Sequence, residues 1–319
     1  MLFITNRFPK ASIRTRLGRS FVFDVNNNAA SNSLFFCESG KDGEHTEIGS
    51  QPMFERLRDS DYRQVLLIVH GFNVQPDQAL EQAERLQKLC DKAKKKEALV
   101  VPLIWPTDND PGVLKDYWDD QRSADLSGFA FARAFGKFMT WRDEDVPCLM
   151  RINILAHSMG SRVLRESVAR WNKDDLANGV PMIFRNVFLV AADVVNETLE
   201  HGEPGLLMSH ASRNVTVYHA AEDLALRASK AVNVRNGIAS RRLGHTGPER
   251  IEKTLPNVVS VDCDDFSMEY DPLDGHTYFL EDPKTKKAGK VFEHIFFAMR
   301  SGRVPAGETG SRVTVLRAE

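Results

Sequence analysis

Short apolar runs alternate with stretches whose apolar residues recur at helical spacing through most of the chain. Continuous apolar runs are typical of strands buried on both faces, and helical spacing is typical of the helices that connect parallel strands. The expected strands lie at 65–72, 98–106, 148–158, 186–194, 214–223 and 257–265. The expected helices lie at 76–90, 127–139, 159–171 and 287–300. This alternation predicts the α/β class, with a mostly parallel central sheet and helices on both of its faces.

The two ends of the chain follow a different pattern. Within residues 1–40, short strands are expected in "MLFITNRF", "FVFDV" and "SLFFCES", separated by turns rich in Asn and Ser. They predict an antiparallel edge added to the main sheet. Residues 301–319 are Gly-rich and polar before their last apolar residues, which predicts a loosely held C-terminal tail. Because no internal repeat or long low-complexity linker interrupts residues 1–300, we expect a single domain there.

Composition is ordinary for a soluble globular protein, with 319 residues of which 42% are hydrophobic and 27% charged. A formal net charge of -2 gives no whole-chain attraction to nucleic acid, so no nucleic-acid partner is expected. No apolar run has the length of a membrane span or a signal-peptide core, so a cytoplasmic location is expected. The four cysteines form no C-x-x-C pair and are expected to be buried free thiols: Cys37, Cys90, Cys148 and Cys263.

A serine stands where one expected strand meets a helix, in "RINILAHSMGSRVL". Ser158 occupies the centre of a G-x-S-x-G-like pattern, in which Gly160 supplies the second glycine and Ala156 replaces the first. A sharp strand-to-helix turn of this kind exposes a nucleophilic hydroxyl above the edge of a sheet. The alternative is that Ser158 only caps the helix that follows it.

A nucleophilic serine needs a base, an acid that orients the base, and donors for the oxyanion. His276 lies in a turn-rich loop after the last expected strand and is the candidate base. Asp223 ends an earlier strand and is the preferred acid, while Asp193 ends another strand and is the alternative acid. The backbone N–H groups of Phe72 and Met159 are the candidate oxyanion donors.

Several further motifs accompany these residues in a fixed order: "FITNR", "VHGFN", "LIWP", "LAHSMGS", "VYHAAEDLAL", "RRLG" and "GHTYF". Together they cover nearly the whole chain. The chain resembles the α/β-hydrolase superfamily, and within it a lipase-like bacterial group of unknown function. The resemblance implies a Ser-Asp-His triad carried by Ser158, Asp223 and His276, but it implies no particular substrate.

The sequence therefore predicts a serine hydrolase that cleaves a carboxylic ester, with a small or lipid-like substrate. An amidase, a thioesterase or an acyltransferase with the same triad remains open, as does a non-catalytic binding protein on this fold. No metal or organic cofactor is expected, because the histidines lack metal-ligand spacing and no phosphate-binding glycine loop is present. The sequence leaves homo-oligomerisation open.

Two regions around the predicted site have weaker assignments. His70, Gly71, Trp105 and His157 are substrate-pocket candidates, although core packing or loop-holding hydrogen bonds would explain them as well. The segment 107–126 is rich in Asp and aromatic residues and is a candidate lid over the cleft.

Overall fold

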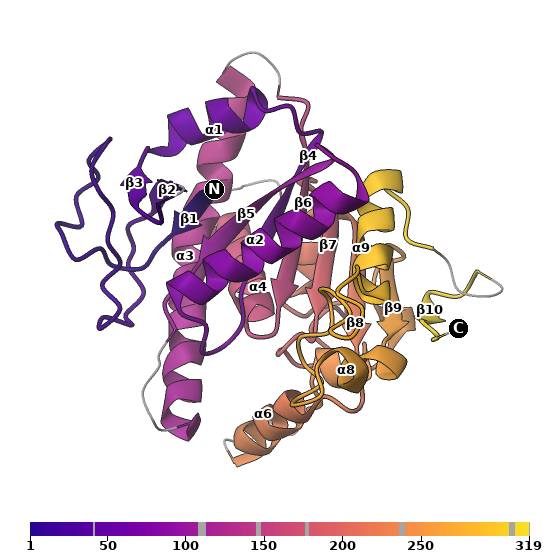
Figure 1. Ribbon diagram of the computed structural model, residues 1–319. Coiled ribbons are helices and arrows are strands. Elements are labelled where there is room, and N and C mark those ends of the chain that lie inside the picture. The colour runs from indigo at the N-terminus through magenta and orange to yellow at the C-terminus, as the bar shows by residue number, and fades with distance from the viewer. Residues whose placement is uncertain are drawn as a thin grey trace.

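The computed structural model describes residues 1–40, 42–107, 113–144, 148–175, 179–235, 240–305 and 310–318. Within these residues the chain forms a ten-stranded sheet in the order β10-β9-β8-β7-β6-β4-β5-β1-β2-β3. Strands β4 to β10 pair in parallel with their neighbours, and β1 pairs in parallel with β5. Strands β3, β2 and β1 pair antiparallel and form one edge of the sheet. Helices cover both faces of the sheet (Figure 1). This arrangement confirms the predicted α/β class and its antiparallel N-terminal edge.

The elements have the following bounds. The strands are β1 (Leu2–Thr5), β2 (Phe35–Ser39), β3 (His45–Glu47), β4 (Gln64–Val69), β5 (Ala98–Ile104), β6 (Arg151–His157), β7 (Phe184–Val190), β8 (Ser212–His219), β9 (Val258–Asp262) and β10 (Val313–Val315). The helices are α1 (Ser50–Arg58), α2 (Pro76–Ala93), α3 (Val113–Glu144), α4 (Gly160–Asp175), α5 (Leu206–His210), α6 (Leu224–Arg235), α7 (Leu243–Thr246), α8 (Asp264–Tyr270) and α9 (Lys290–Ser301), with a 3-10 turn at Ile251–Lys253.

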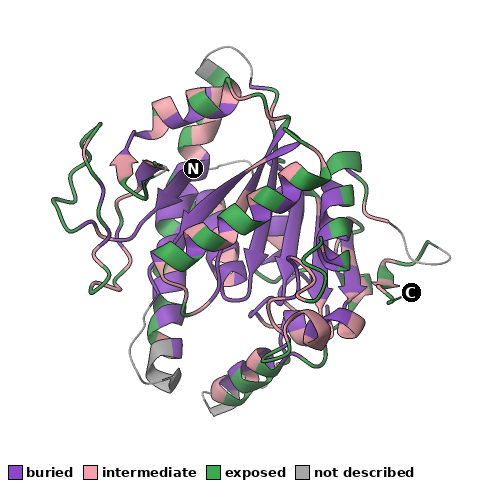
Figure 2. Cartoon of the chain, viewed as in Figure 1, coloured by how far each residue is buried: buried purple, intermediate pink, exposed green. Residues whose placement is uncertain are grey.

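The central strands are buried on both faces because successive side chains alternate between two apolar layers. In β6, Ile154 packs in the layer under α1, α3 and α4, and its neighbour Leu155 packs in the layer under α2 and α9. The strands are buried almost throughout, while each covering helix turns an exposed face outward (Figure 2). This double cover explains why the strands read as continuous apolar runs in the sequence.

A row of amide side chains crosses the sheet near the amino ends of its strands. Asn153 Nδ2 donates to Gln64 Oε1 at 3.0 Å, Asn186 Nδ2 donates to Asn153 Oδ1 at 2.7 Å, and Asn214 Nδ2 donates to Asn186 Oδ1 at 2.9 Å. Asn153 and Asn186 are completely buried. Because these bonds form only when β4, β6, β7 and β8 are correctly paired, the ladder helps to specify their register.

Two predictions at the chain ends are wrong. "FVFDV" is not a strand, because Phe23 makes only an isolated bridge to Pro9 and its ring packs in an aromatic cluster with Phe3. The C-terminal segment is not wholly loose, because β10 pairs in parallel with β9 and Arg312 donates to the carbonyl of Leu255 at 2.8 Å. The antiparallel edge also continues past residue 40, to β3.

The candidate lid is largely helical. Residues 113–126 form the first half of α3, which continues through the helix expected at 127–139, and residues 108–112 lie outside the described residues. Asp120 accepts a hydrogen bond from the backbone N–H of Asn73 at 3.2 Å, so α3 is tied to the loop after β4.

Two further observations concern the whole chain. The four cysteines are buried and free, as predicted. Among the described helices, none combines the length and apolar character needed to cross a bilayer.

Candidate active site

Ser158 stands at the carboxyl end of β6 in a left-handed backbone conformation, with φ of 53°. Few residues other than glycine adopt this conformation, and it is strained for a side chain with a Cβ. The turn is held because the Ser158 N–H donates to the carbonyl of Val190 at 3.0 Å and the Ser158 carbonyl accepts from the Asp193 N–H at 3.1 Å. The local geometry is therefore that of a sharp, strained strand-to-helix turn, or elbow.

The two flanking positions of the elbow have different space requirements. A Cβ at Gly160 would lie 2.5 Å from the carbonyl oxygen of Val69 and 2.6 Å from that of His70, so a side chain is excluded there. Ala156 is completely buried, and its methyl group belongs to the apolar layer under α4. The fold thus requires the second glycine of the pattern and accommodates alanine at the first.

The loop after β4 passes directly over the serine. A Cβ at Gly71 would lie 2.9 Å from Ser158 Cβ and 3.4 Å from Ser158 Oγ, so glycine allows the loop to approach the hydroxyl. The next residue is Phe72. Its backbone N–H and that of Met159 make no hydrogen bond with any residue in the described ranges.

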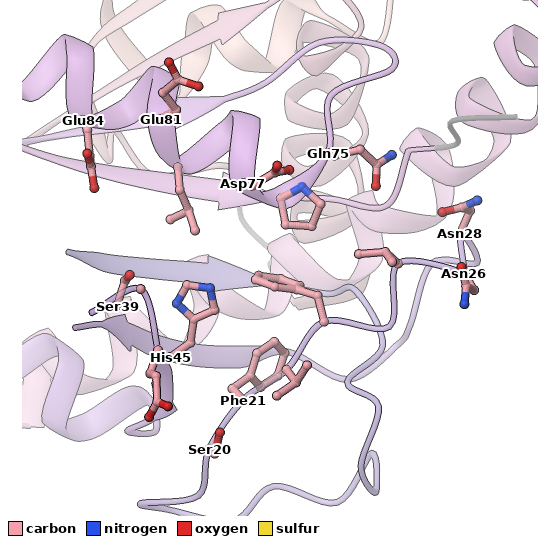
Figure 3. A pocket seen from close by; sticks show the side chains of 17 residues that line it. Ser20, Phe21, Asn26, Asn28, Ser39, His45, Gln75, Asp77, Glu81 and Glu84 are labelled. Carbon is pink, nitrogen blue, oxygen red and sulfur yellow. The ribbon is translucent and has the colours of Figure 1, made fainter. Parts of the chain in front are cut away.

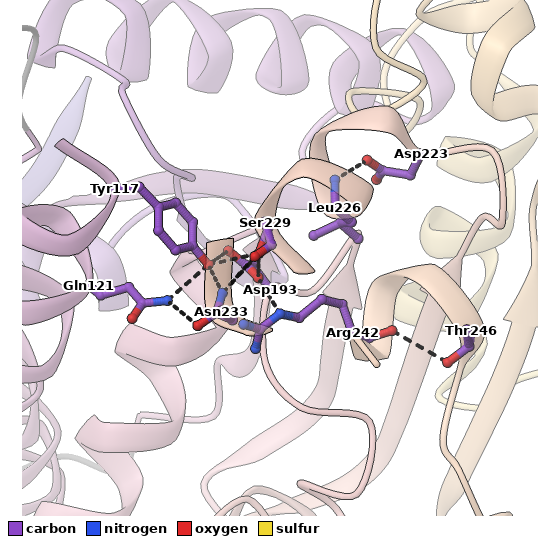
Figure 4. Close-up of polar contacts among 9 residues, drawn as sticks. All are labelled: Tyr117, Gln121, Asp193, Asp223, Leu226, Ser229, Asn233, Arg242 and Thr246. Atoms are coloured by element: carbon purple, nitrogen blue, oxygen red, sulfur yellow. Dashed lines mark hydrogen bonds and ion pairs between the residues drawn. The ribbon is translucent and has the colours of Figure 1, made fainter. Parts of the chain in front are cut away.

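His276 and Asp223 form a close pair. His276 Nδ1 lies 2.7 Å from Asp223 Oδ2. The other oxygen of the fully buried Asp223 carboxylate accepts the backbone N–H of Leu226 at 2.8 Å and so caps the first turn of α6 (Figure 4). The capping bond fixes the carboxylate, and the carboxylate orients the imidazole with Nε2 unprotonated when the ring is neutral.

The charge of Asp223 also sets the basicity of His276. Burial works to lower the pKa of the imidazole, but the hydrogen bond to Asp223 and its negative charge outweigh burial and raise the pKa above the usual 6.5. The negative charge of Asp193 acts in the same direction. Asp223 therefore makes the imidazole of His276 more basic than burial alone would leave it.

The loop that carries His276 is anchored at several points. The Asp271 carboxylate accepts the backbone N–H groups of His276 and Thr277 at 3.1 and 2.9 Å. Gly275 has φ of 64°, a conformation that favours glycine. His157 Nε2 lies 3.2 Å from the His276 carbonyl oxygen, so the residue before Ser158 contacts the loop directly.

The alternative acid, Asp193, is committed to other partners. Tyr117 and Ser229 donate their hydroxyls to its two carboxylate oxygens at 2.8 and 2.6 Å (Figure 4). Arg242 Nε lies 3.3 Å from the same carboxylate, and both of these side chains are 3% exposed. The Tyr117 hydroxyl in turn accepts from Gln121 and Asn233 at 2.9 and 2.8 Å. The structure brings His276 to Asp223, and Asp193 instead joins α3 and α6 to the elbow.

Two of the candidate pocket residues, His70 and Trp105, are buried beneath the loop that carries Gly71. The imidazole of His70 stacks on Trp105, with ring centroids 5.3 Å apart, and Trp105 Nε1 donates to the His70 carbonyl at 2.8 Å. Burial lowers the pKa of His70 to about 4, so it is neutral. Trp105 is completely buried. The pair joins the ends of β4 and β5 beneath the loop of Gly71.

His157 is buried and packs against Phe279, with ring centroids 5.0 Å apart. Burial lowers its pKa well below the usual value. Its Nδ1 has no hydrogen-bond partner among the described residues, and it lies 3.3 Å from the position that a Cβ on Gly71 would occupy. His157 therefore separates the His276 loop from the loop after β4.

The sequence did not single out the residues that support the site. Tyr117, Ser229 and Asn233 come from α3 and α6, which are far apart in the chain, and only their shared burial brings them to Asp193. Asp271 had a local signal, because an aspartate before a Pro- and Gly-containing turn commonly accepts nearby backbone N–H groups. Within the described ranges, no group of three or more His, Cys, Asp or Glu residues is placed to hold a metal ion.

The sheet order and the strand-to-helix turn at Ser158 define the class of an α/β hydrolase. Residues 47–292 match the family described as "Alpha/beta hydrolase of unknown function (DUF900)", and the chain belongs to this family. Among solved structures, one match is the "Crystal structure of Zea mays acyl-protein thioesterase 2", with 14% identity and a TM-score of 0.32, covering 65% of this chain and 86% of that chain. No curated protein sequence matches the chain significantly.

Proposed function

We propose that the chain is a serine hydrolase that cleaves a carboxylic ester through an acyl-enzyme, with Ser158, His276 and Asp223 as its triad. The observation that carries the proposal is the 2.7 Å contact between His276 Nδ1 and Asp223 Oδ2 at the same sheet edge as the strained Ser158. A structural serine that only capped α4 would need neither the left-handed conformation nor a buried Asp-His pair beside it.

Acylation follows from these positions. Ser158 Oγ attacks the ester carbonyl carbon while its proton passes to His276 Nε2. The N–H groups of Phe72 and Met159 donate hydrogen bonds to the resulting oxyanion. When the tetrahedral intermediate collapses, the bond to the alcohol oxygen breaks, and His276 gives the proton to that oxygen. The acyl group remains on Ser158 and the alcohol departs.

Deacylation uses the same groups with water. His276 removes a proton from water as its oxygen attacks the acyl carbon, and the same amides bind the second oxyanion. Collapse releases the carboxylic acid, and the proton returns from His276 to Ser158 Oγ. Asp223 stays ionised throughout and stabilises the imidazolium that forms in each step.

The proposed substrate has an apolar acyl or alcohol part. The support is the aromatic contact between the half-buried Phe72 and Tyr117, whose ring centroids lie 5.8 Å apart beside the oxyanion loop. The proposed location is the cytoplasm, which suits four buried free thiols. The same triad would also serve an amidase, a thioesterase or an acyltransferase. Comparing substrates of these classes separates the four activities.

The test compares hydrolysis of chromogenic carboxylic esters, thioesters and anilides of increasing chain length, with alcohol acceptors added in parallel. Ester hydrolysis is expected, with a loss of activity in Ser158→Ala and none in Ser161→Ala. The control is matched because Ser161 lies three residues later, and its hydroxyl only donates to the Ala156 carbonyl at 3.2 Å. Activity retained in Ser158→Ala would rule out the proposed mechanism. A preference for amides or thioesters would change the proposed substrate class.

A further inference from the structure

A groove lies at the N-terminal edge of the sheet (Figure 3), and Ser158 is not among its lining residues. The first turns of α2 form one wall, and residues 20–28 with 43–45 form the other. Phe21 lies on its floor, and Val22 and Val25 on its rim are 51% and 47% exposed. Val22 and Val25 therefore add apolar surface beside the hollow.

The groove is acidic. Asp77, Glu81 and Glu84 recur on one face of α2, and Glu44 stands on the opposite wall. All four side chains belong to exposed residues, and none forms an ion pair within the described part of the chain. No lysine or arginine occurs among the described lining residues. Burial lowers the pKa of His45, so its imidazole adds no positive charge at neutral pH.

The chain carries a segment of the opposite character next to the groove. Residues 10–17 form an exposed arm that contains Lys10, Arg14 and Arg16, and no described carboxylate pairs with these cations. Ile13 and Leu17 of the arm are 50% and 68% exposed. The arm therefore presents both charges and apolar side chains that match the groove.

The arm lies beside the groove and does not enter it. The backbone N–H of Lys10 donates to the carbonyl of Val22 at 2.9 Å, which attaches the start of the arm to the groove wall, and no residue of the arm lines the groove. Two adjacent patches of opposite charge on one surface are self-complementary under a two-fold axis, because each copy can offer its arm to the groove of the other. Within the described part of one copy, no ion pair joins the two patches.

We propose that the chain forms a two-fold symmetric homodimer in which the arm of each copy, residues 10–17, binds in the acidic groove of the other. Arg14 and Arg16 face the carboxylates of α2, and Ile13 and Leu17 cover the exposed valines. The interface lies on the antiparallel edge of the sheet, so it is independent of the triad and of the proposed ester hydrolysis. Since its charges are at the surface, the dimer weakens as salt concentration rises.

Sedimentation velocity of the full chain across the micromolar range tests the proposal. The wild type is expected to dimerise, more tightly at low salt. Two charge-reversal variants are expected to be monomeric, with dissociation constants raised at least about a hundredfold: Glu81→Lys/Glu84→Lys in the groove and Arg14→Glu/Arg16→Glu in the arm. Circular dichroism spectra that match the wild type would show that both variants fold, as expected for substitutions at exposed residues.

Mixing the two reversal variants gives the most specific result. Each arm then meets a groove of opposite charge, so a heterodimer is expected although neither variant dimerises alone. The chain that combines all four substitutions is expected to dimerise again. A monomeric wild type would overturn the proposal, including one whose groove binds a Lys- and Arg-rich peptide instead. So would a dimer whose dissociation constant is unchanged by the charge reversals, or reversal variants that do not form a heterodimer when mixed.

Discussion

Asp223 connects two elements through its two oxygens, since Oδ2 lies 2.7 Å from His276 Nδ1 and Oδ1 accepts the Leu226 amide at 2.8 Å. The helix α6 therefore holds the Asp223 carboxylate in place. Asp193 has no such link to His276. Its oxygens are occupied by hydroxyls and by Arg242, so the two carboxylates are expected to have different roles.

Substitution of the two aspartates separates these roles. Asp223→Asn is expected to lower kcat by about three to four orders of magnitude with little change in folding, because the imidazole loses its orientation and its charge partner. Asp193→Asn is expected to lower the free energy of unfolding by roughly 2–4 kcal/mol, because it leaves Arg242 buried without a counter-charge. Steady-state kinetics and urea unfolding measure the two effects. A larger loss of kcat in folded Asp193→Asn than in Asp223→Asn would reverse the assignment of the acid.

The pH dependence follows from the raised pKa of His276. In the proposed mechanism neutral imidazole is the active form, so kcat/KM is expected to fall as pH drops through this pKa, with an inflection above the usual 6.5. Because the charges of Asp223 and Asp193 both raise the pKa, neutralising Asp193 with Asn is expected to move the inflection to lower pH. A pH profile of kcat/KM for both proteins tests this, and an unchanged inflection would show that Asp193 does not act on His276.

The elbow glycine gives a steric prediction. Gly160→Ala places a Cβ 2.5 Å from the backbone carbonyl oxygen of Val69. Because the clash is with backbone, rotation of a side chain cannot relieve it. We expect a lower melting temperature and a loss of ester hydrolysis, because α4 must move away from β4. Ala156→Gly is the control and is expected to leave hydrolysis nearly unchanged. Normal stability and turnover in Gly160→Ala would contradict the tight packing of the elbow.

The amide ladder gives a stability prediction that is independent of function. Asn186→Leu removes the partner of both Asn153 and Asn214 and leaves polar atoms without hydrogen bonds inside the sheet. The expected loss in the free energy of unfolding is about 2–4 kcal/mol, measured by urea denaturation. Asn214→Ala removes only an end of the ladder and is expected to cost less. Equal costs, or none, would show that the ladder does not help to hold the strands.

Much of this architecture could be predicted because central strands such as β4 and β6 must be apolar on both faces. The three-residue strands β3 and β10 could not, because so short a segment becomes a strand only through the neighbour with which it pairs. The first half of α3 was not recognised as helix, because its polar residues, such as Gln121, are buried against partners on other elements. Such distant partners cannot be inferred from the local sequence.

The position of the candidate site could be inferred from the sequence to a similar extent. Ser158, His276 and Asp223 lie at strand ends and in loops after strands, where function is expected in this class of fold. The difference between Asp223 and Asp193 could not be predicted, because both follow strands and only the fold decides which carboxylate meets the imidazole. The same limit applied to Trp105, which lies at a strand end but is enclosed by His70 and the core.

Reaction with a fluorophosphonate probe tests the central claim most directly, because the probe modifies a serine only when a base and an oxyanion site activate it. Peptide mapping of the labelled protein is expected to place the modification on Ser158, with no labelling in Ser158→Ala and strongly reduced labelling in His276→Ala. A folded wild-type protein that does not react, or one modified at another serine, would contradict the account.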